Sequence, residues 1–276
     1  MPPSQLPEIP ERDAPADIAA IYHDMRRTMR LPLVNLVYRH LATLPGLLPW
    51  VWGAVRPAIL SGVLDAAVER VTTSAEIVPL DPIDAATLEQ AGLSADEITS
   101  IARVVAAYNR GNSLNLVALS AVRQALDGPL AGAPGRAGPE PPQFSQRALP
   151  PIRRIEELDQ PLAARIGEIA ALHGGGEAGV IPSLYLHLAN WPPFLALVAD
   201  RVLPPLQDGT VGRARDELVL LARTEAQQLA PALSTSTPVP GEHEDHLRRV
   251  LSTFAAGVIP EMACIGLGLA RALRPA

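Results

Sequence analysis

The sequence contains a single cysteine, Cys264, so an intramolecular disulfide framework is excluded. A lone cysteine is also typical of a protein from a reducing compartment. No run of 18 or more apolar residues occurs, which predicts that no segment spans a membrane. The first residues lack the apolar stretch of a secretory signal peptide. From these absences we expect a cytoplasmic protein without a membrane segment.

The charge distribution argues against nucleic acid as a partner. The net charge is −6, and the basic residues are scattered along the chain. Proteins that bind nucleic acid gather positive charge on one face or segment. Hydrophobic residues make up 48 % of the 276 residues and charged residues 19 %, which is enough to build a substantial core. The partner that we expect is a small molecule.

Two stretches of the chain are similar to each other. YRHLATLPGLLPWVWGAVRPAI (38–59) aligns without gaps with YLHLANWPPFLALVADRVLPPL (185–206), with 9 of 22 positions identical at an offset of 147. Helical spacing of apolar residues precedes both stretches, at Ile18, Ile21 and Met25 and at Ile166, Ile169 and Leu172. Each copy ends in an Ala/Leu-rich helix, near 118–126 and near 264–273. The sequence therefore predicts a duplication.

The predicted fold class is all-α, with five or six helices in each copy. Alternation of apolar and polar residues with a period of two is nearly absent, and Ser94 and Glu97 have the spacing of a capping box. The segment between the copies is too rich in Pro and Gly for a regular element. We predict a first repeat at 12–127, a linker at 128–154 and a second repeat at 155–273, related by a pseudo-twofold axis as in a fused dimer. A pocket is expected between the halves. Whether the chain is a monomer or a homodimer stays open.

Three segments carry a resemblance to a known family. RLPLVNLVYRHLATLPGLLPW (30–50), YNRGN (108–112) and SLYLHLANWP (183–192) occur in the order found in the group I 2-haloacid dehalogenases, which act on D- and L-2-haloacids. The resemblance covers roughly 18–273. It implies two helical repeats with the active site between them and direct displacement of halide by water. An aspartate would act as general base and an asparagine would hold the water. We expect no cofactor.

The resemblance assigns these roles to positions of this chain with one exception. The asparagine matches Asn112, which also fits a turn after Gly111, and the serine before the aspartate matches Ser183. The aspartate itself falls on Leu184. Two aromatic pocket positions of the family fall on Leu33 and Leu36. A tyrosine and an arginine of the family's pocket fall on Phe254 and Ala256. We therefore expect a more apolar pocket without the usual base, whose loss lowers rates by about 10²–10⁴-fold.

Other polar residues are weaker candidates. Asn115 lies one turn beyond Asn112 on the same side of the helix. Glu261 lies in the apolar segment VIPEMACIGLGLA, where it is either an early-turn acid favoured by the helix dipole or a desolvated carboxylate that replaces the base. In the alignment of the two repeats, Glu261 takes the position that Asn115 has in the first repeat. Tyr38 and Tyr185 are repeat equivalents, which favours a packing role, although Tyr185 could offer its hydroxyl to a substrate.

Two histidine-containing motifs are less informative. HEDH (243–246) has only two histidines, and zinc sites need more ligands, so we expect an exposed helix start and no metal. HGGGE (173–177) lacks the lysine of a phosphate-binding loop, and we interpret it as a flexible entry to the pocket helix of the second repeat.

Three functions stay open at this point. The first is nucleophilic substitution at an sp³ carbon of a small carboxylic acid, as an intramolecular ring-forming displacement because Leu184 cannot activate water. The second is 2-haloacid hydrolysis by a displaced base, and the third is non-catalytic binding of a small molecule. The candidate catalytic residues are Asn112 and Glu261, and the candidate substrate-binding residues are Ser183, Leu184, Tyr185, Leu33, Leu36, Asn115 and Tyr38.

Overall fold

The computed structural model describes residues 6–127, 148–173, 181–229, 233, 239–240 and 243–273, and its regular elements are helices, with no strand in these ranges. The all-α prediction is confirmed. The first half contains α1 (Ala16–Met29), α2 (Leu36–Leu41), α3 (Leu47–Leu60), α4 (Val63–Ser74), α5 (Ala85–Gln90) and α6 (Ala95–Ala125). The second half contains α7 (Gln160–Ala170), α8 (Ser183–Leu188), α9 (Pro192–Gln207), α10 (Thr210–Leu229), α11 (Glu244–Thr253) and α12 (Ile259–Ala272).

Helix α6 begins where its capping box predicts. The Ser94 hydroxyl accepts from the Glu97 backbone N–H, and the Glu97 carboxylate accepts from the Ser94 N–H at 2.9 Å. The helix then continues unbroken to Ala125, so Gly111 and Asn112 lie inside it. The interpretation of Asn112 as a turn residue is therefore wrong. The neighbouring Gly111 favours a break in an isolated helix, but the packing of α6 against other helices keeps this segment helical.

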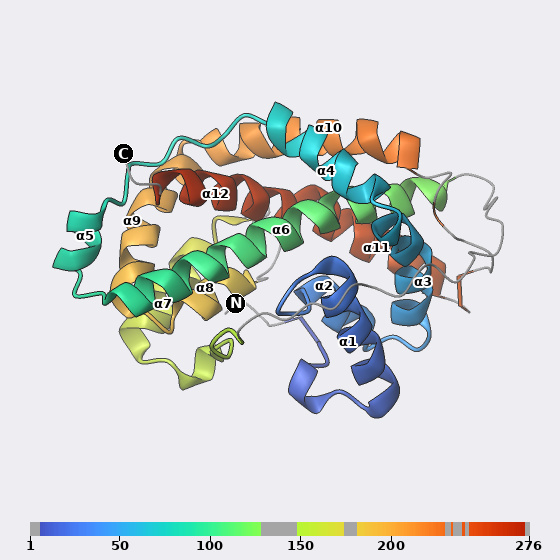
Figure 1. Cartoon of the computed structure of the whole chain (residues 1–276), viewed down its shortest axis with the longest axis horizontal. Helices are drawn as coiled ribbons and strands as arrows, with labels where there is room; N and C mark the ends of the chain where they lie inside the picture. Colours follow the sequence, from blue (N-terminus) through green and yellow to red (C-terminus); the bar gives the residue numbers. More distant parts are fainter. Residues whose placement is uncertain are drawn as a thin grey trace.

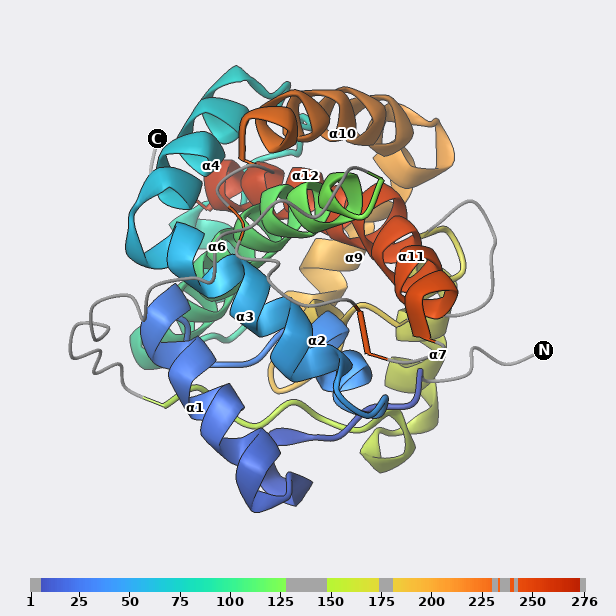
Figure 2. The ribbon, with the colours of Figure 1, turned by 90° about the vertical axis from the view of Figure 1, so that its right-hand side faces the viewer.

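Helices α6 and α12 run side by side through the middle of the molecule (Figures 1 and 2). Helix α10 packs against α6, α12 and α4. In Figure 1, α1 and α2, in blue, lie below α6 on one side, and α7 and α8, in yellow, lie on the other side. Buried side chains of both halves form one continuous core, which includes Cys264. The two halves thus share their interior.

The helix bounds follow the offset of the sequence duplication. Both ends of α8 lie 147 residues after those of α2, α10 begins 147 residues after α4, and α12 ends 147 residues after α6. This agreement supports the predicted tandem repeat. Residues 128–147 of the predicted linker lie outside the described residues, and the domain boundaries stay a prediction.

The two central helices approach each other at a glycine. The Asn109 side-chain amide donates to the Gly266 carbonyl at 2.9 Å, and a Cβ at position 266 would lie 1.9 Å from the Asn109 Oδ1 atom. No larger residue fits without displacing Asn109. This contact sets the spacing of α6 and α12, which carry residues of the pocket described below.

One long helical segment has the composition of a membrane span. Residues Glu244–Ala272 have a mean hydropathy of 1.7 in their most apolar window, although 67 % of that window is buried in the molecule. Helices α3 and α4 meet the same test only as a pair, and they are bent by 82°. Core helices have the same composition, so these features are weak evidence for a membrane.

Candidate functional site

A pocket lies where both halves meet around the two central helices. Its empty volume is about 480 Å³, and we call it the inner pocket. Apolar side chains form most of its wall, and one guanidinium and several amide and hydroxyl groups complete it. The lining residues are Leu33, Asn35, Leu36, Val37, Arg39, Tyr108, Asn112, Asn115, Pro182, Ser183, Leu184, Phe254, Val258, Ile259 and Met262.

The lining follows the offset of the repeat. Five pairs of lining residues are 147 positions apart in the chain, which supports a pocket between two related halves. In four pairs one half supplies a polar side chain and the other an apolar one, so the pocket can orient an asymmetric ligand. The pairs are Asn35 and Pro182, Leu36 and Ser183, Val37 and Leu184, Asn112 and Ile259, and Asn115 and Met262.

The inner pocket brings together most of the residues that the sequence singles out. Of the predicted set, Asn112, Asn115, Ser183, Leu184, Leu33 and Leu36 line it. Phe254 also lines it, whereas Ala256 does not. Tyr38, Tyr185 and Glu261 are buried but are not among its lining residues.

Several polar atoms in the inner pocket have no partner in the described protein. These are Asn35 Oδ1, the Tyr108 hydroxyl and both terminal atoms of the Asn115 amide. Buried polar groups are nearly always hydrogen-bonded, so such a cluster favours a site that a polar ligand or water completes. Burial raises the pKa of the Tyr108 hydroxyl, which stays protonated at neutral pH and can donate.

Asn35 reaches the pocket because α6 has a glycine opposite it. A Cβ at Gly111 would lie 2.8 Å from Asn35 Nδ2 and 2.9 Å from Asn35 Oδ1. The glycine of the YNRGN segment therefore allows the Asn35 amide to pack directly on the α6 backbone. This close approach explains why a glycine, Gly111, precedes Asn112 better than a turn does.

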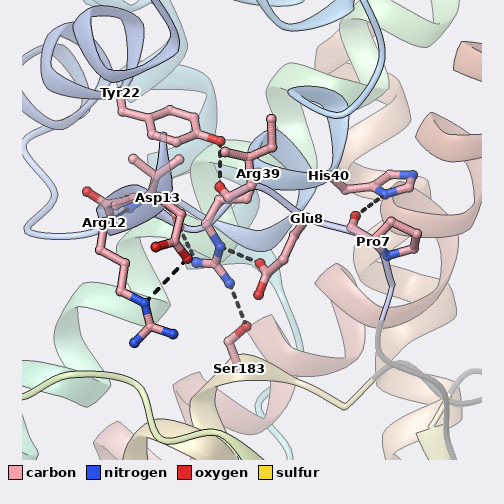
Figure 3. Close-up of polar contacts among 11 residues, drawn as sticks. Pro7, Glu8, Arg12, Asp13, Tyr22, Arg39, His40 and Ser183 are labelled. Carbon is pink, nitrogen blue, oxygen red and sulfur yellow. Dashed lines mark hydrogen bonds and ion pairs between the residues drawn. The ribbon is translucent and has the colours of Figure 1, made fainter. Parts of the chain in front are cut away.

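Arg39 is a pocket residue that the sequence reasoning missed. Its side chain is buried, and its Nε donates to Glu8 Oε2 at 2.6 Å and its Nη1 to the Val34 carbonyl at 2.6 Å (Figure 3). Its Nη2 lies 3.4 Å from Ser183 Oγ in the other half. The aligned stretches contained a signal, because Arg39 is paired with the apolar Leu186.

Glu261 takes part in a buried polar network away from the pocket lining. Its Oε1 accepts from Arg215 Nη1 at 3.0 Å, and its Oε2 lies 2.9 Å from His173 Nδ1. His173 Nε2 lies 2.9 Å from the Tyr185 hydroxyl. A tautomer with the proton on Nδ1 lets Tyr185 donate to His173 and His173 donate to Glu261. His173 thus belongs to the core, while residues 174–180, which include the predicted flexible entry, lie outside the described residues.

A π-helical turn explains why the pocket takes Met262 and not Glu261. The turn spans Phe254–Val258 and accommodates one extra residue in the helix. In the sequence pairing, Tyr108 corresponds at an offset of 146 to Phe254, the first residue of the turn, whereas the pocket residues after the turn correspond at 147. Our pairing of Asn115 with Glu261 used the offset of 146 beyond this turn, where the offset is 147. The residue that corresponds to Asn115 in the pocket lining is Met262.

Among the residues that the structure describes, those that line the inner pocket include no Asp, Glu or His. Groups that take up and release protons near neutral pH are therefore missing from its described wall. What the lining can do is bind, orient and stabilise charge through N–H and O–H donors. No group of three or more His, Cys, Asp or Glu that could hold a metal ion occurs in the described part of the chain.

Acidic pH is expected to destabilise the fold through His187, which is 1 % exposed. Burial lowers the pKa of its imidazole from 6.5 to about 4. Between these pH values the unfolded chain binds a proton at this ring and the folded protein does not. The free energy of unfolding should therefore fall as the pH drops from about 6.5 to about 4, by about 3 kcal/mol in total.

Denaturant unfolding at pH 7, 5.5 and 4.5 measures this effect. His187→Asn should reduce the loss of stability across the range, whereas His23→Gln, which removes an exposed histidine, should keep it. Equal losses in the wild-type protein and His187→Asn would show that other groups cause the acid sensitivity.

Comparison with known proteins relates the chain to dehalogenases, although no family model matches it. It is 28 % identical over 215 residues to a configuration-inverting 2-haloacid dehalogenase of Alcaligenes xylosoxydans xylosoxydans, covering 74 % of this chain and 70 % of that protein. It is 26 % identical over 216 residues to a configuration-inverting 2-haloacid dehalogenase of Pseudomonas sp. (strain 113), covering 73 % and 67 %.

Solved structures show the same fold. A D-2-haloacid dehalogenase mutant superimposes with a TM-score of 0.72 and 19 % identity, covering 99 % of both chains. The complex of a D-2-haloacid dehalogenase mutant with D-2-CPA gives a TM-score of 0.66 and 18 % identity, covering 98 % of this chain and 97 % of that one. The predicted resemblance is thus supported by sequence relatives, and the helical fold is that of D-2-haloacid dehalogenase.

Proposed function

We propose that this protein binds small 2-substituted carboxylic acids in the inner pocket and displaces the substituent with a nucleophile that the substrate itself carries. The observation that carries this proposal is the composition of the pocket wall, whose described residues combine donors and apolar groups and include no Asp, Glu or His. The dehalogenase relatives and fold support the choice of an sp³ carbon next to a carboxylate as the reacting centre. Water as the nucleophile is disfavoured because Leu184 cannot accept its proton.

The reaction would close a ring on a substrate such as a 2-halo-3-hydroxy acid. The substrate hydroxyl oxygen forms a bond to C2 while the C2–halogen bond breaks, and the halide leaves with the bonding electrons. The hydroxyl proton passes to water, and the product is an epoxy acid. Because both reacting groups belong to one molecule, the pocket has only to hold them in line.

The unpaired donors of the pocket suit the charge that this reaction develops. The Tyr108 hydroxyl and the Asn115 amide can donate to the departing halide in a site with low exposure to water. Asn112 is available to orient the substrate oxygen, and Leu184 and the apolar wall opposite limit the space for a competing water.

Non-catalytic binding of a carboxylic acid is the second candidate. The same wall favours it, because hydrogen-bonding groups without an acid or base are sufficient for a binding site. The two candidates differ in whether a bound acid is converted.

Incubation with 2-chloro-3-hydroxypropionate and with 2-chloropropionate separates these functions. We expect chloride and glycidate from the hydroxy acid at a rate at least about tenfold above chloride release from 2-chloropropionate, since the hydroxyl is held beside C2 in the same molecule, whereas a water must first be captured and oriented. Ion chromatography and NMR of the products provide the measurement, and reactions without protein give the spontaneous rate. Lactate from 2-chloropropionate at a comparable rate would indicate hydrolysis instead, and saturable binding without chloride release would indicate a binding protein.

A further inference from the structure

A second, wider cavity adjoins the inner pocket. Its empty volume is about 1720 Å³, and we call it the outer cavity. It is lined by the N-terminal segment, parts of α1, α2 and α8, and the described chain from Leu149 to Glu156. Both cavities share Leu33, Leu36, Arg39 and Ser183, which therefore form the throat between them. Arg39 is the charged side chain at this throat.

The lining of the outer cavity is more basic than the protein as a whole. It includes five arginines, Arg12, Arg26, Arg39, Arg153 and Arg154, against three glutamates, Glu8, Glu11 and Glu156. Among the described residues of the lining the balance is two positive charges, whereas the whole chain has a net charge of −6. A concave surface with one excess sign of charge concentrates ions of the opposite sign. The outer cavity therefore favours small anions.

The Arg39 guanidinium is held in place by two short hydrogen bonds and retains N–H groups for a ligand. Glu8 and the Val34 carbonyl hold its Nε and Nη1. Its contact with Ser183 Oγ, at 3.4 Å, is longer than a good hydrogen bond, so an incoming acceptor can replace it at little cost. A guanidinium has five N–H groups, and these three contacts within the described residues leave two of them. In Figure 3 the Nη2 end points from the first half towards Ser183.

We infer that Arg39 and Ser183, one from each half, form a carboxylate-binding clamp at the throat between the two cavities. One carboxylate oxygen accepts from Arg39 Nη2 and the other from the Ser183 hydroxyl. The rest of the ligand extends into the inner pocket, against Leu184 and the apolar wall. The clamp selects small monocarboxylates over neutral analogues. This assignment rests on the proposed function for the kind of ligand, but it concerns binding and not turnover.

Binding of 2-chloropropionate and 2-chloropropionamide tests the clamp by calorimetry or NMR titration. The wild-type protein should bind the acid at least about tenfold more tightly than the amide, because a charge-assisted hydrogen bond is roughly twice as strong as a neutral one. The double variant Glu8→Gln/Arg39→Gln removes both charges and avoids an unpaired buried carboxylate. It should weaken binding of the acid on the order of 30-fold while changing the amide little.

Two single variants sharpen the test. Glu8→Gln should bind the acid as tightly as the wild type or more tightly, because it frees an N–H of Arg39 and removes a competing anion. Ser183→Ala should weaken binding of the acid a few-fold. Arg26→Gln is the matched control, since Arg26 lines the outer cavity but not the throat. It should keep the preference for the acid.

The preference for acid over amide is a readout that a purely structural arginine would not change. Equal binding of the two probes by the wild type, or an unchanged preference in a folded double variant, would overturn the clamp. A preference that depends on Arg39 without any halide release would support the clamp and contradict the proposed catalysis. The two proposals can therefore fail separately.

Discussion

Leu184→Asp is expected to raise chloride release from 2-chloropropionate by about 10²–10⁴-fold over the wild-type protein. Leu184 is 1 % exposed and lines the inner pocket next to Ser183. The family resemblance assigns the general base to this position. A carboxylate there could accept the proton of a water bound by Asn112, which lines the same pocket. Chloride and lactate would be measured together, because hydrolysis forms them in equal amounts.

The predicted repeat offers a matched control for this variant. Val37 is the counterpart of Leu184 in the first half, is also 1 % exposed and also lines the pocket. Val37→Asp should not gain activity, since no asparagine is assigned to hold water beside it, and Leu184→Asn should not gain activity because an amide is not a base. An equal gain in Val37→Asp would mean that any buried acid suffices. A folded Leu184→Asp protein that binds the acid and releases no chloride would contradict a pocket arranged for substitution.

Glu261→Gln is expected to lower the free energy of unfolding by about 3 kcal/mol, because breaking a buried ion pair leaves its partner without compensation. Glu261 is 3 % exposed, and its two oxygens contact Arg215 at 3.0 Å and His173 at 2.9 Å. Neutralising the carboxylate removes the charge that Arg215 faces and disturbs the chain of contacts to Tyr185. Denaturant unfolding at pH 7 measures the loss.

Glu225→Gln serves as the control for this substitution. Glu225 pairs with Arg70 at 2.6 Å, but Arg70 is 54 % exposed, so the same change should cost less than about 1 kcal/mol. The experiment also tests Glu261 as a displaced base. Halide release abolished by Glu261→Gln with stability unchanged would support that role, and unchanged release with lowered stability would support the structural role.

Much of the fold could be predicted from local patterns in the sequence. The spacing of apolar residues predicts helices, and the Ser94–Glu97 box predicts the start of α6 correctly because capping depends on groups three residues apart. The repeated stretches at 38–59 and 185–206 predict the positions of α2 and α8, whose bounds differ by the predicted offset of 147. Breaks were harder to predict, because Gly111 favours a turn locally while its surroundings in the core keep it helical.

The lining of the inner pocket was predicted in part, whereas the functional roles of its residues stay a prediction. A repeat alignment and a family resemblance bring Asn112, Ser183 and Leu184 to one pocket, since both depend on the order of residues along the chain. They do not reveal Arg39, because its partners, Glu8 and Ser183, are distant in the sequence. Glu261 illustrates the same limit, as one extra residue in the π-helical turn rotates the helix surface beyond it.

The sequence by itself determined that this chain is helical, that the stretches 38–59 and 185–206 are similar, and that the position assigned to the acid holds leucine. These properties follow from short-range spacing and from residue identity. Only the tertiary structure decided which buried polar groups face the pocket and which satisfy one another in the core. Its decisive contacts, Arg39 with Ser183 and Glu261 with His173 and Arg215, join segments between 46 and 144 residues apart. Such pairings depend on the packing of whole helices, which no local pattern of residues specifies.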